Sequence, residues 1–210
     1  MKTFRNISMV LLLFVTQATF AVGTLEEGID AYNNGDYKSA LVILKPFAEK
    51  GNTEASSRLA LMYDGVDGVK QDYKKALYWF EKAGNGGHGA SSLYAGLAHF
   101  NGQGVPANLN NAVKWYKKSA AQGHGFAHFV IGAYYYEGTK TTKKDRTQAA
   151  KWFKSGAELG DDSSLYTLGI MYYNGEGGLP VDHLAAISLW VKAAEQGNEE
   201  AKKLLSKSLN

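Results

Sequence analysis

Cysteine is absent from the 210 residues of this chain. Its absence excludes disulfide bonds, thiolate metal sites and cysteine nucleophiles. Proline is also scarce, with 3 residues against 24 glycines, which favours helices that end at glycine turns. The formal net charge is only +3, and Lys2 and Arg5 contribute to it, so the remainder gives no electrostatic reason to expect a nucleic-acid partner.

Residues 1–21 have the pattern of a secretory signal peptide. Lys2 and Arg5 precede an apolar run from Ile7 to Val15, and small residues follow as far as Ala21. The run is too short to cross a bilayer as a helix. We therefore predict cleavage after Ala21, export to the bacterial periplasm or beyond, and no stable membrane insertion of the mature chain. An uncleaved amphipathic helix is the alternative.

From Thr24 onward the chain repeats with a period of about 36 residues, which is typical of solenoids of helical hairpins. The second helix of each hairpin has an alanine near its start and a glycine after its end. A residue that can cap the helix precedes each alanine. The alanines are Ala40, Ala76, Ala112, Ala149 and Ala186, the glycines are Gly51, Gly87, Gly123, Gly160 and Gly197, and the caps are Asp36, Asp72, Asn108, Asp145 and Asp182.

Gly96, Gly132 and Gly169 recur at one position inside the first helices. Glycine within a helix costs about 1 kcal/mol relative to alanine. Its recurrence therefore predicts close approach of a bulky aromatic side chain from the second helix. Two adjacent positions of the second helices supply such residues. One has Trp79, Trp115 and Trp152, with Leu189 in the last unit, and the next has Phe80, Tyr116, Phe153 and Trp190. Most of the tryptophans are therefore expected in the core.

The segment from Leu59 to Ala83 has the order LALMY, then GV, then D-x-x-KAL-x-WF-x-KA. This segment and its copies resemble Sel1-like repeats, which are relatives of the tetratricopeptide repeat. The four repeats are 53–88, 89–124, 125–161 and 162–198. Residues 24–51 resemble a tetratricopeptide-type hairpin, and residues 199–210 are expected to form a capping helix. The resemblance implies an all-α, right-handed α-solenoid of antiparallel helical hairpins that serves as a protein-interaction platform.

Catalytic and metal-binding patterns are missing from the sequence. No serine has a lysine three residues later, and no Gly-x-Ser-x-Gly elbow occurs. His124 and His128 lie four residues apart, but no carboxylate completes a metal motif, so both are interpreted as structural. We predict no catalytic residue, no cofactor and no metal site.

A strip on the first helices is the candidate partner-binding surface. Each first helix has a small residue at one recurring position, namely Ala55, Ser91, Ala127, Ser164 and Ala201. We take this residue to face the second helix of its own hairpin. Counting 100° per residue from it then places a set of apolar residues on the opposite, concave side. The strip is either an open groove or is consumed by packing between repeats. Its residues are Leu93, Leu97, Phe100, Phe129, Ala133, Tyr136, Tyr166, Ile170 and Tyr173.

A second candidate is the loop with Lys140, Lys143 and Lys144. This loop is one residue longer than those of the two preceding repeats, as is the loop of the last repeat. It is interpreted as a solvated insertion, with docking of an acidic partner surface as the alternative.

The leading functional hypothesis is a non-enzymatic periplasmic scaffold that binds a protein or an extended peptide in its concave groove. The resemblance also implies two more specific roles. One is an immunity protein that neutralises an antibacterial phospholipase-type toxin, and the other is an adaptor for an envelope protein. A hydrolase acting on the cell wall or on β-lactams is the lower alternative.

Overall fold

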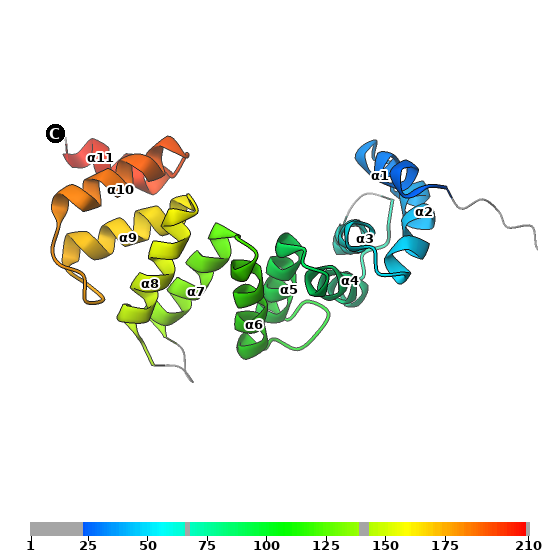
Figure 1. The fold of residues 1–210 in the computed structure, drawn as a ribbon, viewed down its shortest axis with the longest axis horizontal. Coiled ribbons are helices and arrows are strands. Elements are labelled where there is room, and N and C mark those ends of the chain that lie inside the picture. Colours follow the sequence, from blue (N-terminus) through cyan, green and yellow to red (C-terminus); the bar gives the residue numbers. More distant parts are fainter. Residues whose placement is uncertain (1–22, 66–67, 139–142, 209–210) are drawn as a thin grey trace, which may run out of the picture.

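The computed structural model describes residues 23–65, 68–138 and 143–208, and these segments contain helices and loops but no strand (Figure 1). The predicted signal peptide and Lys140 lie outside the described residues. The helices are α1 (Leu25–Asn33), α2 (Tyr37–Glu49), α3 (Thr53–Gly65), α4 (Tyr73–Asn85), α5 (Gly89–Asn101), α6 (Leu109–Ala121), α7 (Gly125–Glu137), α8 (Arg146–Glu158), α9 (Asp162–Asn174), α10 (His183–Glu195) and α11 (Glu199–Ser208).

Consecutive helices pair into hairpins, and the hairpins stack into a curved array whose two ends lie far apart (Figure 1). Each helix packs on the next along the chain. The most extensive contacts that skip a helix join α7 to α9 and α1 to α3, and all four are first helices of hairpins. This arrangement places the first helices on the inner side of the stack, where successive units approach each other most closely. The predicted α-solenoid of helical hairpins is therefore confirmed.

The predicted capping residues and closing glycines set the ends of the second helices. Each cap accepts a hydrogen bond from the backbone N–H three residues later, as Asp145 does from Gln148 at 2.9 Å and Asn108 does from Asn111 at 3.0 Å. Each closing glycine has a positive φ, such as +83° at Gly123, which a residue with a side chain rarely adopts. The helix boundaries therefore follow directly from short polar residues and glycines.

The mid-helix glycines admit the aromatic residues of the second helices, as predicted. A Cβ atom added to Gly132 would lie 2.6 Å from the Phe153 ring. Gly96 lies against Tyr116 in the same way, and Gly169 lies against Trp190. Because a close-packed interior has no spare volume, these glycines set the distance between the two helices of each hairpin.

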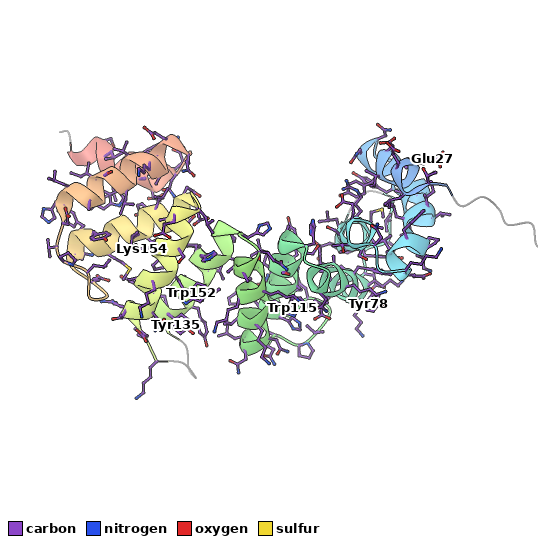
Figure 2. All side chains as sticks on the ribbon, in the orientation of Figure 1. Glu27, Tyr78, Trp115, Tyr135, Trp152 and Lys154 are labelled. Carbon is purple, nitrogen blue, oxygen red and sulfur yellow. The ribbon has the colours of Figure 1, made fainter. Side chains whose placement is uncertain are left out.

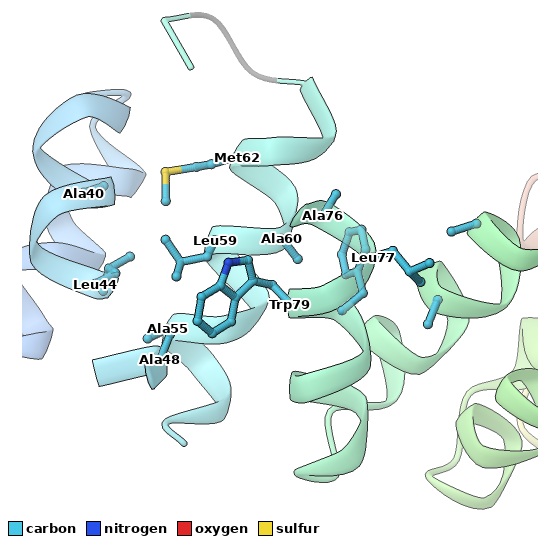
Figure 3. Close-up of a cluster of buried hydrophobic side chains, with 13 residues drawn as sticks. Ala40, Leu44, Ala48, Ala55, Leu59, Ala60, Met62, Ala76, Leu77 and Trp79 are labelled. Carbon is cyan, nitrogen blue, oxygen red and sulfur yellow. The ribbon is translucent and has the colours of Figure 1, made fainter. Parts of the chain in front are cut away.

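The core is divided into successive clusters between the helices. The N-terminal cluster includes Ala48 of α2, Leu59 of α3 and Trp79 of α4, so it joins neighbouring units rather than filling one (Figure 3). Three further clusters continue along the array. Each unit therefore depends on its neighbours to bury its apolar surface, as in other repeat proteins. Among the described helices, none is both long and apolar enough to span a membrane.

Candidate protein-binding surface

Charge is segregated between the two sets of helices. The ionisable residues of α1, α3, α5, α7 and α9 other than His and Tyr are Glu26, Glu27, Asp30, Glu54, Arg58, Asp64, Glu137 and Asp162. The second helices are rich in lysine instead, with Lys38, Lys45, Lys74, Lys75, Lys82, Lys114, Lys117, Lys118, Lys151, Lys154 and Lys192. The inner side of the stack is therefore acidic and the outer side basic, although the net charge of the chain is small.

The small-residue position of the first helices faces the preceding unit, which corrects the predicted orientation. The hydroxyl of Ser91 donates a hydrogen bond to the hydroxyl of Ser57 on α3 at 3.2 Å. A Cβ on Gly156 of α8 would collide with Ser164 of α9. The second helix of the same hairpin packs instead beside the mid-helix glycine. The error arose because periodicity gives angles within a helix but does not give the direction of its neighbours.

With the first helices oriented in this way, most of the predicted strip lies at the edge of the core. Leu93 and Leu97 pack against the cluster around Tyr116, Phe129, Ala133 and Tyr136 pack against the cluster around Phe153, and Tyr166 and Ile170 pack against the cluster around Trp190. These seven side chains are partly buried. Only Phe100 and Tyr173 are widely exposed, at 53% and 47%. A role of the strip in partner binding stays a prediction, and its accessible part is small.

Tyr136 is held by groups within the chain. Its hydroxyl donates a hydrogen bond to Glu176 at 2.7 Å, and the Arg146 guanidinium lies 4.9 Å from the centre of its ring. Arg146 is also 3.6 Å from the Glu176 carboxylate. The hydrogen bond to this carboxylate raises the pKa of Tyr136 above its usual value. Tyr136 therefore links α7 to the loop after α9.

Tyr94 and Phe126 are accessible aromatic residues that the predicted strip did not include. Tyr94 is 41% exposed and stacks on Phe80 with ring centres 5.0 Å apart. Phe126 is 43% exposed and lies 5.8 Å from the Phe129 ring. Tyr94 comes two residues before Gly96, about 200° away around the helix, so the glycine marked the side of α5 opposite Tyr94.

An apolar cavity of about 350 Å³ lies where α5 and α6 meet the following first helix, α7. Phe100, which belongs to the predicted strip, forms one wall, and Tyr116 of α6 also lines the cavity. Val130 of α7 lies opposite, and Glu137 is the charged residue of the lining. The complete lining is Phe100, Leu109, Val113, Tyr116, Val130, Ala133, Tyr134, Glu137 and Gly138. A cavity of this kind can hold one or two apolar side chains beside a carboxylate.

The same position in neighbouring units is occupied differently. One unit earlier, where α4 meets α5, the cavity is only about 170 Å³ and is lined by Asp64, Leu77 and Tyr94, among others. One unit later, the equivalents of Phe100 and Leu109 are Tyr136 and Arg146, which are engaged with Glu176. The cavity at Phe100 is therefore the largest opening of this series.

The two described lysines of the long loop make one weak contact. Lys143 and Lys144 are exposed, and Lys144 lies 3.6 Å from Glu137 with both side chains largely in solvent. An exposed pair of this kind contributes little to stability, typically less than about 1 kcal/mol. Docking of an acidic partner on this loop stays a prediction.

The histidines make local contacts. His88 accepts a hydrogen bond from the Ser91 N–H at 3.2 Å, His128 lies 3.0 Å from the His124 carbonyl, and His99 contacts Glu81 at 2.9 Å. Among the residues that the structure describes, no group of three or more potential ligands is placed to hold a metal ion.

Comparison with known proteins identifies the repeats. The Sel1 repeat family profile matches residues 53–88, 90–124, 125–161 and 162–198. A Sel1 repeat protein from Oxalobacter formigenes is 31% identical, with a TM-score of 0.78 over 88% of this chain and 75% of that chain. The protein c5321, a protective antigen present in uropathogenic Escherichia coli strains, is 36% identical with a TM-score of 0.71 over 77% of this chain and 34% of that chain.

A more distant likeness shows the fold alone. The immunity protein Pa5087 from Pseudomonas aeruginosa is 19% identical, with a TM-score of 0.52 over 83% of this chain and 68% of that chain. No curated protein matches the sequence. The predicted resemblance to Sel1-like repeats is thus confirmed by the matched repeats and by the two more similar structures.

Proposed function

Because this chain belongs to the Sel1 repeat family, whose members are generally protein-interaction scaffolds, we propose that it is a non-enzymatic scaffold of the bacterial periplasm. Its partner is a protein that presents an extended segment to the first helices. The segment inserts an apolar side chain into the cavity at Phe100 and extends along α5 and α7.

The cavity is the observation that carries this proposal. It combines an exposed aromatic side chain, Phe100, with a buried aromatic base, Tyr116. Aromatic residues around a desolvated pocket are typical of interface positions that contribute most of the binding energy. Tyr94 and Phe126 widen the accessible apolar surface on the same set of helices.

Charge on the first helices supports a basic partner segment. Asp64 and Glu137 line the two successive open cavities. The first helices α5, α7 and α9 contain no lysine or arginine. A segment with an apolar anchor flanked by lysine or arginine therefore complements this surface, and its association should weaken as salt increases.

Selection from a peptide library displayed on phage tests the proposal. The expected peptides contain an aromatic or aliphatic anchor next to a basic residue. Phe100→Ala should weaken their binding at least tenfold, whereas Tyr78→Ala should leave it unchanged, since Tyr78 is an equally exposed aromatic residue on the second helix α4. Enrichment of acidic peptides, or equal binding to both variants, contradicts the proposal.

An immunity role is the more specific candidate. The fold shared with Pa5087 is compatible with it, but at 19% identity the likeness extends to the fold alone. The role predicts a gene for a phospholipase-type toxin beside the gene for this chain, and protection of cells that express the chain from that toxin. Absence of protection would favour the adaptor role.

A further inference from the structure

Three tryptophans of the second helices, Trp79, Trp115 and Trp152, pack against the second helix of the preceding unit. Trp79 of α4 lies beside Ala48 of α2 (Figure 3). A Cβ atom on Gly84 of α4 would lie 3.0 Å from the ring of Trp115 of α6. Trp152 of α8 packs against the cluster that contains Ala120 of α6. The indole rings, of which Trp115 and Trp152 are labelled in Figure 2, thus fill the space between successive second helices.

The last junction has a leucine where the others have tryptophan. Leu189 of α10 occupies this position, and Ala157 of α8 is the equivalent of Ala48, Gly84 and Ala120. Ala48 and Ala120 are 0% and 6% exposed, whereas Ala157 is only partly buried. The shorter side chain of Leu189 therefore leaves the facing helix uncovered.

A groove of about 570 Å³ lies at this place between α8 and α10. Leu165, Leu168 and Tyr172 of α9 form its apolar floor, and Ala157 and Leu189 lie on its two walls. Its volume falls within the range of about 300–1,000 Å³ that is usual for ligand sites. Ser188 and Gln196 also line the groove, and both side chains can accept a hydrogen bond from an indole N–H.

A lysine next to the groove lacks the aromatic ring that its equivalents contact. The Lys82 ammonium lies 5.1 Å from the centre of the Trp79 ring, and the Lys118 ammonium lies 5.2 Å from that of Trp115. Lys192 is at the same position of α10 and lines the groove. Within the described part of the chain, its side chain forms no hydrogen bond or ion pair. An ammonium group attracts the electron-rich face of an aromatic ring.

We propose that the groove between α8 and α10 is a docking site for an aromatic side chain, tryptophan above all, from a partner polypeptide. The incoming indole takes the space that Trp79, Trp115 and Trp152 fill in the other units, and Lys192 lies over its face. This site is on the outer side of the stack, away from the cavity at Phe100. It does not depend on the function proposed above.

Binding of N-acetyltryptophanamide to the full mature chain tests the proposal, with amide chemical shifts followed by NMR. Shifts are expected in Ala157, Leu168 and Ser188, with N-acetylglycinamide as the ligand control. Lys192→Ala should raise the Kd several-fold, because it removes the cation–π contact from an exposed position where it does not support the core. Phe100→Ala should leave the Kd unchanged, which separates this site from the cavity on the first helices.

Leu189→Trp provides a second, independent test. If the groove is the space of a missing indole, the new tryptophan fills it from within the chain. The variant should then raise Tm by about 2–4 °C and abolish the changes in amide chemical shift that N-acetyltryptophanamide causes. A lower Tm overturns the claim that the space fits an indole. Absence of ligand-induced shifts in the unmodified chain, shifts centred on Phe100, or an unchanged Kd in Lys192→Ala each overturns the proposed docking site.

Discussion

Replacing Gly132 by alanine tests the packing that sets the geometry of each hairpin. The added methyl group would lie 2.6 Å from two carbon atoms of the Phe153 ring and 3.0 Å from a third. Phe153 is 1% exposed, so a shift of its ring would have to displace neighbouring core side chains. Overpacking of this kind costs about 1–3 kcal/mol. The higher helix propensity of alanine returns about 1 kcal/mol.

The expected net effect is a loss of about 1–2 kcal/mol, because three ring atoms are affected and the ring is enclosed. Tm should fall by about 2–8 °C in a chain of this size, as measured by circular dichroism. In a Phe153→Leu background the substitution should become neutral or stabilising, which gives a coupling free energy of about 0.5–3 kcal/mol. A rise in Tm for Gly132→Ala in the unmodified chain would refute the packing argument.

Three further effects follow from single contacts. Burial raises the pKa of Tyr116 to about 12, so the neutral phenol stabilises the fold below pH 10 and this contribution is lost as pH rises toward 12; Tyr116→Phe should therefore show a smaller fall in Tm between pH 8 and pH 11. Tyr136→Phe removes the hydrogen bond to Glu176 and should lower the free energy of unfolding by about 0.5–1.5 kcal/mol at pH 7, and Glu176→Gln should cost less in this variant than in the unmodified chain. Asp145→Ala leaves the N–H of Gln148 without its cap and should cost about 1 kcal/mol in urea unfolding, whereas Asp145→Asn should cost little.

Most of the fold could be predicted because local signals recur in every unit. Asp145 and its equivalents mark helix starts, and Gly123 and its equivalents mark helix ends. The glycines inside first helices predicted their aromatic neighbours correctly, since only a missing side chain permits such close approach. These signals depend on the chain's own backbone geometry and therefore do not depend on how neighbouring units stack.

The orientation of the first helices could not be predicted in the same way. Angles counted from Ser91 placed Leu93 and Leu97 opposite the second helix, but the structure places Ser91 against Ser57 of the preceding unit. The direction assigned to Ser91 was therefore wrong, because helical periodicity does not say on which side of a helix its neighbours lie. Taking Gly96 as the reference would have turned the expected surface toward Tyr94.

The contacts of Tyr136 could not be predicted from the sequence either. Glu176 comes from the loop that follows the next first helix, and its contact with Tyr136 depends on how two units stack. Likewise, the sequence showed that Leu189 replaces tryptophan, but only the structure shows a groove beside it.

Site-specific photo-crosslinking in living cells tests the central claim most directly, because it captures a partner whose identity is unknown. A photoreactive phenylalanine analogue is placed at Phe100 or Phe126 on the first helices, and at the equally accessible Tyr78 on α4. Binding along the first helices predicts one discrete crosslinked protein from Phe100 and Phe126 and none of that mass from Tyr78. The same adduct from Tyr78, with none from Phe100 or Phe126, would contradict the account.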